Sequence, residues 1–227
     1  MKQLPIIFKR EFTSFFATPL AYVFLLIFLV LSSVFTFYLG GFYESGQANL
    51  NPFFNFHPWL YLFLVPALAM RMWAEERKSG TIELLMTLPI TRFESVVGKF
   101  LAAWVTAGIA LLLTFPMVLT VNYLGDPDNG AILTGYLGSW LLVGAYLSVG
   151  SCMSALAKNQ VIAFILTVSL CFLFVVSGFS LVLDIFNGWA PQWLLDAVAS
   201  FSFLTRFQAI SKGVIDVRDL LYFLSFI

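Results

Sequence analysis

Residues 20–43 read LAYVFLLIFLVLSSVFTFYLGGFY and contain no Asp, Glu, Lys or Arg. A helix of about 20 apolar residues crosses the roughly 30 Å hydrocarbon core of a bilayer. This run is too long for the apolar region of a signal peptide, and no small-residue cleavage site follows it. It therefore predicts a membrane-spanning helix rather than a cleaved leader.

Apolar runs of this kind recur along the chain. Complete spans are expected at residues 20–43, 53–73, 96–124, 131–157 and 159–183. The last run, LLYFLSFI at 220–227, reaches only about 12 Å as a helix. We expect it to be the start of a truncated sixth span; a run that ends in the interface is the alternative. The predicted fold class is all-α, a polytopic transmembrane helical bundle with five complete helices and a truncated sixth.

The composition agrees with a protein that is solvated by lipid. Of the 227 residues, 60% are hydrophobic and 11% are charged, whereas soluble domains have about 45–50% and about 25%. So few charges cannot cover a water-facing surface, so the lipid membrane is an expected partner. The formal net charge is zero and says nothing about nucleic acid; we expect no nucleic-acid partner for a chain of this class. The two cysteines form no CxxC motif, so no thiol metal site is expected.

The basic residues predict the orientation. A cytoplasmic N-terminus and five crossings place segments 1–19, 71–99 and 157–159 in the cytoplasm. These segments hold nine of the twelve Lys and Arg residues. Cytoplasmic loops are enriched in Lys and Arg, so we expect a multi-pass protein whose N-terminus is cytoplasmic.

Residues 3–18 predict an amphipathic helix that lies in the membrane interface. Lys9 and Arg10 occupy the side opposite its apolar face. The apolar face consists of Leu4, Ile7, Phe8, Phe12, Phe15 and Phe16.

The only long cytoplasmic loop is the most charged part of the chain. Pro89 is expected to stop a short helix that begins near Ser79 or Thr81. Ile82, Leu85, Met86 and Leu88 give that helix an apolar surface. Two interpretations stay open: the helix rests on lipid headgroups, or it inserts into a groove of a soluble partner.

On the opposite side of the membrane, residues 184–219 predict a helix at the outer rim that is interfacial or re-entrant. Pro191 is suitably placed to start it. Small residues spaced four apart in the fourth span, Gly144 with Ser148 and Gly150 with Ser154, permit close helix approach. We favour packing within the subunit over a dimer seam.

Catalytic motifs are absent from the sequence. It contains no HExxH, GxSxG or GxxxxGK[ST], so we expect no enzyme activity and no bound cofactor in this chain. The lone His57 is expected to be interfacial rather than a metal ligand. Any energy-driven work must then draw on a partner, and the long loop is the expected docking surface.

That loop carries a family resemblance. Residues 74–90, AEERKSGTIELLMTLPI, resemble the E-E-(basic)-x-G-T-x-E-x-L-x-x-x-P signature of bacterial ABC-2 type transport permeases. Lys9-Arg10-Glu11-Phe12 followed by Thr18-Pro19 resembles the opening helix of that family. Residues 203–207 and 212–216 are similar to the segment before its last helix. Together they look most like the gliding-motility-type branch.

The resemblance implies six membrane helices, an elbow helix at 3–18 and a coupling loop at 74–95. It implies a single permease domain over 1–227 in the bacterial inner membrane, dimerised with a second copy or a homologous permease. The dimer is expected on cytoplasmic ABC ATPase subunits that bind ATP and Mg, with an outer-side accessory subunit as a further candidate.

Three sets of candidate residues result, the first two from the resemblance and the third from the aromatic outer segment. The expected ATPase-coupling residues are Glu75, Glu76, Arg77, Ser79, Gly80, Thr81, Ile82, Glu83, Leu84, Leu85, Leu88 and Pro89. The elbow residues are Leu4, Ile7, Phe8, Lys9, Arg10, Phe12, Phe15 and Phe16. The expected outer-side gate or partner surface consists of Trp189, Trp193, Phe201, Phe203 and Phe207.

The expected function is the permease subunit of an ATP-driven exporter. The alternative is a mechanotransmitter, an ABC-2-like scaffold that passes ATPase motion to an outer-side partner and moves no substrate.

Overall fold

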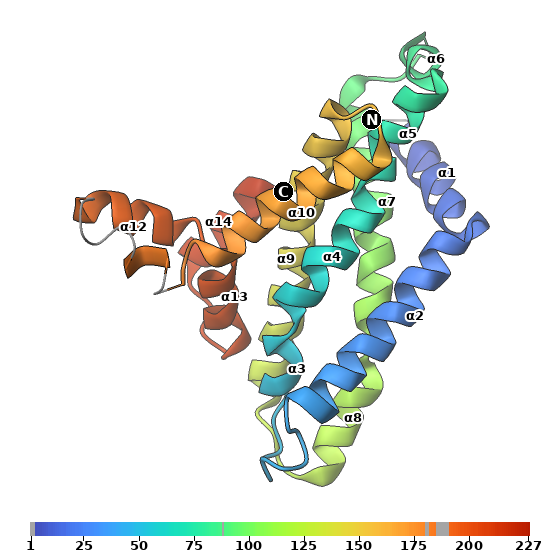
Figure 1. Ribbon diagram of the computed structural model, residues 1–227. Coiled ribbons are helices and arrows are strands. Elements are labelled where there is room, and N and C mark those ends of the chain that lie inside the picture. The colour runs from blue at the N-terminus through green and yellow to red at the C-terminus, as the bar shows by residue number, and fades with distance from the viewer. Residues whose placement is uncertain (1–2, 88, 180–181, 185–190) are drawn as a thin grey trace.

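The computed structural model describes residues 3–87, 89–179, 182–184 and 191–227. The described elements are all helices (Figure 1). Three helical stretches are long and apolar enough to cross a membrane: Pro19–Leu39, Arg92–Leu124 and Asn129–Leu156. Gln160–Val176 is a shorter apolar helix.

The N-terminal half consists of two helices and a broken segment. Helix α1 (Leu4–Ala17) is followed at once by α2 (Pro19–Val34), whose first residue is a proline, a favoured position for the start of a helix. A π-helical turn, η1 (Phe35–Leu39), extends α2. The chain between residues 50 and 80 is divided into α3 (Asn51–Asn55), α4 (His57–Ala69) and α5 (Arg71–Ser79). Gly80, at φ 73°, ends α5 and leads into the short α6 (Thr81–Thr87).

The next two long helices form a hairpin. Helix α7 (Arg92–Leu112) continues, after a turn at Thr114, as α8 (Phe115–Leu124). The Asp128 side chain accepts hydrogen bonds from the Gly130 and Ala131 amides and so caps α9 (Asn129–Leu156).

Helix α9 is the centre of the fold and contacts α4, α5, α7, α10, α13 and α14. Its small residues make this possible. A Cβ at Gly135 would collide with Phe54, one at Gly144 with Ile227 and one at Gly150 with Ala69. These close approaches are to other elements of the same chain, so Gly144 and Gly150 serve packing within the subunit.

The C-terminal part comprises α10 (Gln160–Val176), α12 (Gln192–Ser200), α13 (Phe203–Ser211) and α14 (Val217–Phe226). Helix α12 projects away from the bundle (Figure 1). Helices α13 and α14 pack on α9, and Arg206 pairs with the buried Asp219 at 2.6 Å to join them.

Two groups of predicted residues lie inside the bundle. Phe203 and Phe207 are buried, at 0% and 1% exposure, because α13 packs onto α9 at Gly138; they cannot form an outer surface in this conformation. His57 is also buried inside the bundle. Its Nδ1 lies 2.6 Å from Ser139 Oγ of α9, among Phe28, Phe53 and Tyr61.

Candidate functional site

Figure 1 places α1, α5 and α6 together at one end of the bundle, opposite the end formed by α3 and α8. Helix α1 packs mainly along the first turns of α7. Its buried residue, Ile7, fits against Gly98, where a Cβ would lie 2.7 Å from the Ile7 side chain. A larger residue at 98 would push α1 away from α7.

The start of α7 is also fixed to α1 by hydrogen bonds. Thr91 and Glu94 form a capping box, in which each side chain accepts a hydrogen bond from the backbone amide of the other. The second oxygen of Glu94 accepts from the Gln3 amide at 3.3 Å. The N-termini of α1 and α7 are therefore held together.

A charged group joins α1, α5 and α7; we call Arg10, Glu11, Glu76 and Lys99 the junction cluster. Lys99 Nζ on α7 lies 2.7 Å from Glu76 Oε1 on α5 and 3.2 Å from Glu11 Oε1 on α1. Arg10 pairs with Glu11 and lies 4.0 Å from Glu76. The positive charges of Arg10 and Lys99 thus balance the two carboxylates.

The junction cluster is largely shielded from solvent. The Lys99 side chain is 4% exposed and lies 5.5 Å from the centre of the Trp73 ring, a cation–π distance. A buried charge is tolerated when it is paired, and removal of one partner leaves an uncompensated charge. The cluster is therefore a fixed connection among three helices.

A second ion pair lies beside the cluster on α5. Arg71 donates to Glu75 with an Nε–Oε2 distance of 2.7 Å, and it also donates to Thr18 at the end of α1. The hydrogen bond from Arg71 lowers the pKa of Glu75, and the positive charges nearby act in the same direction. A cavity of about 420 Å³ between α1 and α5–α6 is lined by both charged groups together with Thr81, Leu84 and Leu85.

The expected coupling residues divide into two groups. Glu76 faces the junction, Glu75 pairs with Arg71, and Leu85 is 6% exposed. Glu76 therefore points toward Lys99 of α7 rather than toward the outer surface of α5. The residues on the outer surface of α5 and α6 are Arg77, Ser79, Gly80, Thr81, Glu83, Leu84 and Pro89, with Ile82 half-buried.

The expected elbow face is partly buried against the bundle. Lys9 and Arg10 are exposed, and Ile7 is buried. The remaining apolar residues of that face are half-buried: Leu4, Phe8, Phe12, Phe15 and Phe16. Of the expected outer residues, Trp193 and Phe201 are exposed on α12 and at its end. Leu88 and Trp189 lie outside the described residues.

The sequence analysis did not identify Lys99 and Glu11 as site residues. Lys99 did carry a signal, because it is the only charge that interrupts the apolar run 96–124. An isolated lysine at such a position needs a partner, but the sequence does not show which carboxylate supplies it.

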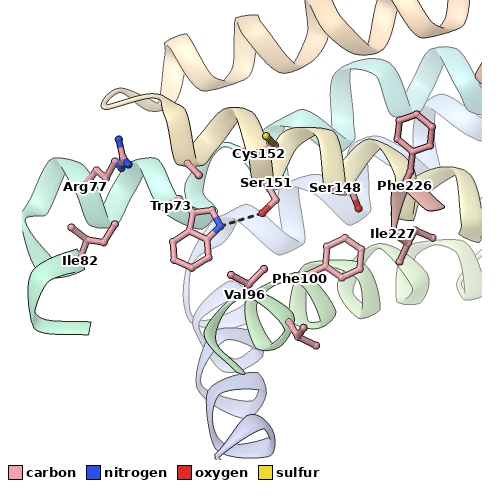
Figure 2. A pocket seen from close by; sticks show the side chains of 12 residues that line it. Trp73, Arg77, Ile82, Val96, Phe100, Ser148, Ser151, Cys152, Phe226 and Ile227 are labelled. Carbon is pink, nitrogen blue, oxygen red and sulfur yellow. Dashed lines mark hydrogen bonds between the residues drawn. The ribbon is translucent and has the colours of Figure 1, made fainter. Parts of the chain in front are cut away.

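An apolar groove of about 500 Å³ lies next to the junction, between α5, α7 and α9. Figure 2 shows Trp73 near one end of this groove and Phe226 and Ile227 near the other. Among the described residues, no group of three or more His, Cys, Asp or Glu side chains is arranged to hold a metal ion.

Comparisons with known proteins agree on one family. The model of the ABC-2 family transporter protein matches residues 6–222. The chain is 31% identical over 113 residues to the probable multidrug ABC transporter permease YbhS of Escherichia coli K12, covering 49% of this chain and 29% of that protein. It is 34% identical over 89 residues to the inner membrane transport permease YhhJ of the same strain, covering 37% and 22%.

A third relative is the probable ABC transporter permease protein NosY of Pseudomonas aeruginosa. Identity to it is 31% over 127 residues, which cover 52% of this chain and 46% of that protein. The chain therefore matches less than half the length of each of these three relatives.

Proposed function

Because the chain belongs to the ABC-2 family of transporter proteins, we propose that it is the permease subunit of an ATP-driven exporter in a bacterial inner membrane. In this proposal the N-terminus, α1, α5 and α6 lie in or next to the cytoplasm. The segments at 20–43, 53–73, 96–124, 131–157 and 159–183 cross the membrane. A second copy or a homologous permease completes the pathway.

The junction cluster is the observation that carries the proposal. It joins α1 and α5 to the start of α7 through ion pairs that are mostly shielded from solvent. Helix α6 follows α5 directly, and Gly80 and Leu84 are exposed there, Leu84 at 67%. An exposed leucine on a short helix beyond the membrane end of a bundle suits a groove on a soluble protein.

The proposed mechanism follows from these connections. ATP and Mg bind to the partner ATPase subunits, and closure of that pair displaces α6. Through α5 and Glu76 the displacement reaches Lys99 and Glu11, so that α1 and the start of α7 move with α6. The membrane helices then open or close the interface between the two permeases. Nucleotide hydrolysis stays on the partner, and this chain contributes no catalytic group.

A mechanotransmitter is the second candidate. Trp193 is 70% exposed and Phe201 52% exposed, and α12 extends away from the bundle (Figure 1). These aromatic side chains suit an outer-side protein partner as well as they suit lipid. Transport by the reconstituted complex, measured with and without ATP, distinguishes an exporter from a scaffold that only transmits motion.

The coupling proposal is tested by ATPase stimulation in the reconstituted complex. Leu84→Asp places a charge on the exposed face of α6, and Glu83→Arg reverses one; we expect both to abolish stimulation while the permease remains folded. Lys158→Asp, at an exposed site in the short link between α9 and α10, is the matched control and should stay close to wild type. Full stimulation in the Leu84→Asp complex would overturn the coupling role of α6.

A further inference from the structure

The helix that leads to the coupling segment is interrupted at Met70, between α4 and α5. In an uninterrupted helix the Trp73 amide donates to the Ala69 carbonyl and the Ala74 amide to the Met70 carbonyl. Here both amides donate instead to the hydroxyl of Ser154 on α9, each at 3.1 Å. The same hydroxyl donates to the Met70 carbonyl at 3.0 Å.

Ser154 therefore replaces one turn of backbone hydrogen bonds. A serine hydroxyl has one hydrogen to donate and two lone pairs to accept with, and all three are used. Ser154 is 0% exposed, so water does not compete for them. Insertion of a side chain into the hydrogen-bond ladder is an established cause of helix kinks.

The surroundings of Ser154 fix the interruption in place. Gly150, one turn earlier on α9, allows Ala69 to approach the α9 backbone. Ser151 accepts a hydrogen bond from the Trp73 indole at 3.1 Å (Figure 2). Pro66, four residues before Met70, has no amide hydrogen for the ladder of α4. Ser154 and Ser151 thus bind the backbone and a side chain at the start of α5, and Gly150 makes room for the end of α4.

We propose that Ser154 is a positioning residue for coupling: its hydroxyl holds the α4–α5 ladder open and sets the direction in which α5 and α6 leave the bundle. Its place in coupling rests on the function proposed above. Because Glu76 of α5 is bound to Lys99, a change in the direction of α5 is passed to α7 and α1 as well. Ser154 is then the fixed point about which the coupling segment turns.

The test is a distance between spin labels in the complex with its ATPase subunits. Labels at Lys78→Cys and Val161→Cys, both exposed positions on α5 and α10, are measured with Cys152 replaced by Ser. In Ser154→Ala the Ala74 amide is free to donate to the Met70 carbonyl. The regular backbone hydrogen bonding of a helix can then continue from α4 into α5. We expect the label distance to shift beyond the width of the wild-type distribution and ATPase stimulation to fall severalfold.

Two controls separate this effect from general damage. Ser148→Ala removes a hydroxyl from the same helix, but one that donates only to Gly144 of α9 itself; its distance should equal that of wild type. Ser151→Ala loses the hydrogen bond to the Trp73 indole but keeps the hydrogen bonds of Ser154 to the backbone. Its label distance should therefore also equal that of wild type. If Ser154→Ala folds poorly, Ser154→Cys keeps a side chain of similar size with weaker hydrogen bonds and should shift in the same direction.

An unchanged distance in Ser154→Ala would overturn the proposal, and so would a shifted distance with full ATPase stimulation. Failure of the function proposed above has a different signature. In that case Leu84→Asp leaves ATPase stimulation intact, whereas the label distance in Ser154→Ala still shows whether the Ser154 hydroxyl sets the direction of α5.

Discussion

At the scale of single residues, we expect replacement of Lys99 to reduce the stability of the folded protein most. Replacing it with Met leaves Glu11 and Glu76 close together with the local cation reduced to Arg10. Breaking a buried ion pair from one side costs about 3–5 kcal/mol, so we expect a clear loss of thermal stability in detergent, measured by unfolding monitored with size-exclusion chromatography.

The triple variant Lys99→Met, Glu11→Gln, Glu76→Gln separates charge from packing. It removes the unpaired carboxylates, and replacement of a whole buried ion group is often close to neutral. We expect it to recover most of the stability lost in the single variant. A triple variant that is less stable than Lys99→Met would contradict this description of the cluster.

The ionisation of Glu75 predicts how the stability of the folded protein depends on pH. The hydrogen bond from Arg71 lowers its pKa in the folded protein, so the folded state favours the carboxylate more than the unfolded state does. The resulting stability is present above the ordinary glutamate pKa of about 4.3 and is lost as the pH falls through the lower folded value.

Glu75→Gln should therefore differ from wild type at pH 7 and converge with it at acid pH. The Glu75 side chain is 45% exposed, so the difference at pH 7 is expected to be only about 0.3–0.5 kcal/mol, as for other pairs spaced four residues apart on a helix. Unfolding midpoints measured from pH 7 down to about pH 2, below the ordinary glutamate pKa of about 4.3, give the comparison. A difference between the two unfolding midpoints that widens toward acid pH would contradict a lowered pKa of Glu75 in the folded protein.

At the scale of elements, the contact between α1 and α7 depends on Gly98. A Val at this position would meet Ile7, and overpacking of this kind costs roughly 1–3 kcal/mol. We expect Gly98→Val to release α1, which limited trypsin digestion at Lys9 and Arg10 detects as faster cleavage. Val96→Leu, at an exposed site on the same helix, should be cleaved at the wild-type rate; equal rates for all three proteins would show that Gly98 does not hold α1.

The elements also show what the sequence could predict. The runs 96–124 and 131–157 are visible as long stretches without charge, and helices long and apolar enough to cross a membrane occur in both places. The interruption at Met70 was not predicted, because it depends on a serine 84 residues later in the chain. Phe203 and Phe207 were expected on an outer surface because they lie in the outer segment 184–219, and the sequence does not show that α13 buries them.

The candidate site was predictable to a similar degree. The 74–90 motif located the loop, and Leu84 and Glu83 are exposed there as a docking surface requires. The motif did not reveal that Glu76 and Leu85 are turned inward, because Lys99, the partner of Glu76, lies in another segment and the burial of Leu85 depends on the tertiary packing. Local patterns describe one helix at a time, whereas the junction cluster is a property of three.

At the scale of the whole molecule, the described helices form a bundle around α9 with two distinct ends (Figure 1). One end holds α1, α5 and α6, and the other holds α3 and α8. The proposed orientation places Lys78 in the cytoplasm and Asp126, in the turn before α9, outside. We expect a membrane-impermeant maleimide to label Asp126→Cys in intact cells and Lys78→Cys only after permeabilisation, with Cys152 replaced by Ser; the reverse pattern would invert the topology.

The central claim is that α6 docks on an ATPase subunit. The most direct measurement is photocrosslinking in cells from benzoylphenylalanine placed at Leu84, with Tyr123, an exposed residue at the opposite end, as the matched position. We expect a covalent adduct between Leu84 and an ATP-binding ABC subunit and none from Tyr123. An ATPase adduct from Tyr123, or its absence at Leu84 in a complex that copurifies with the ATPase, would contradict it.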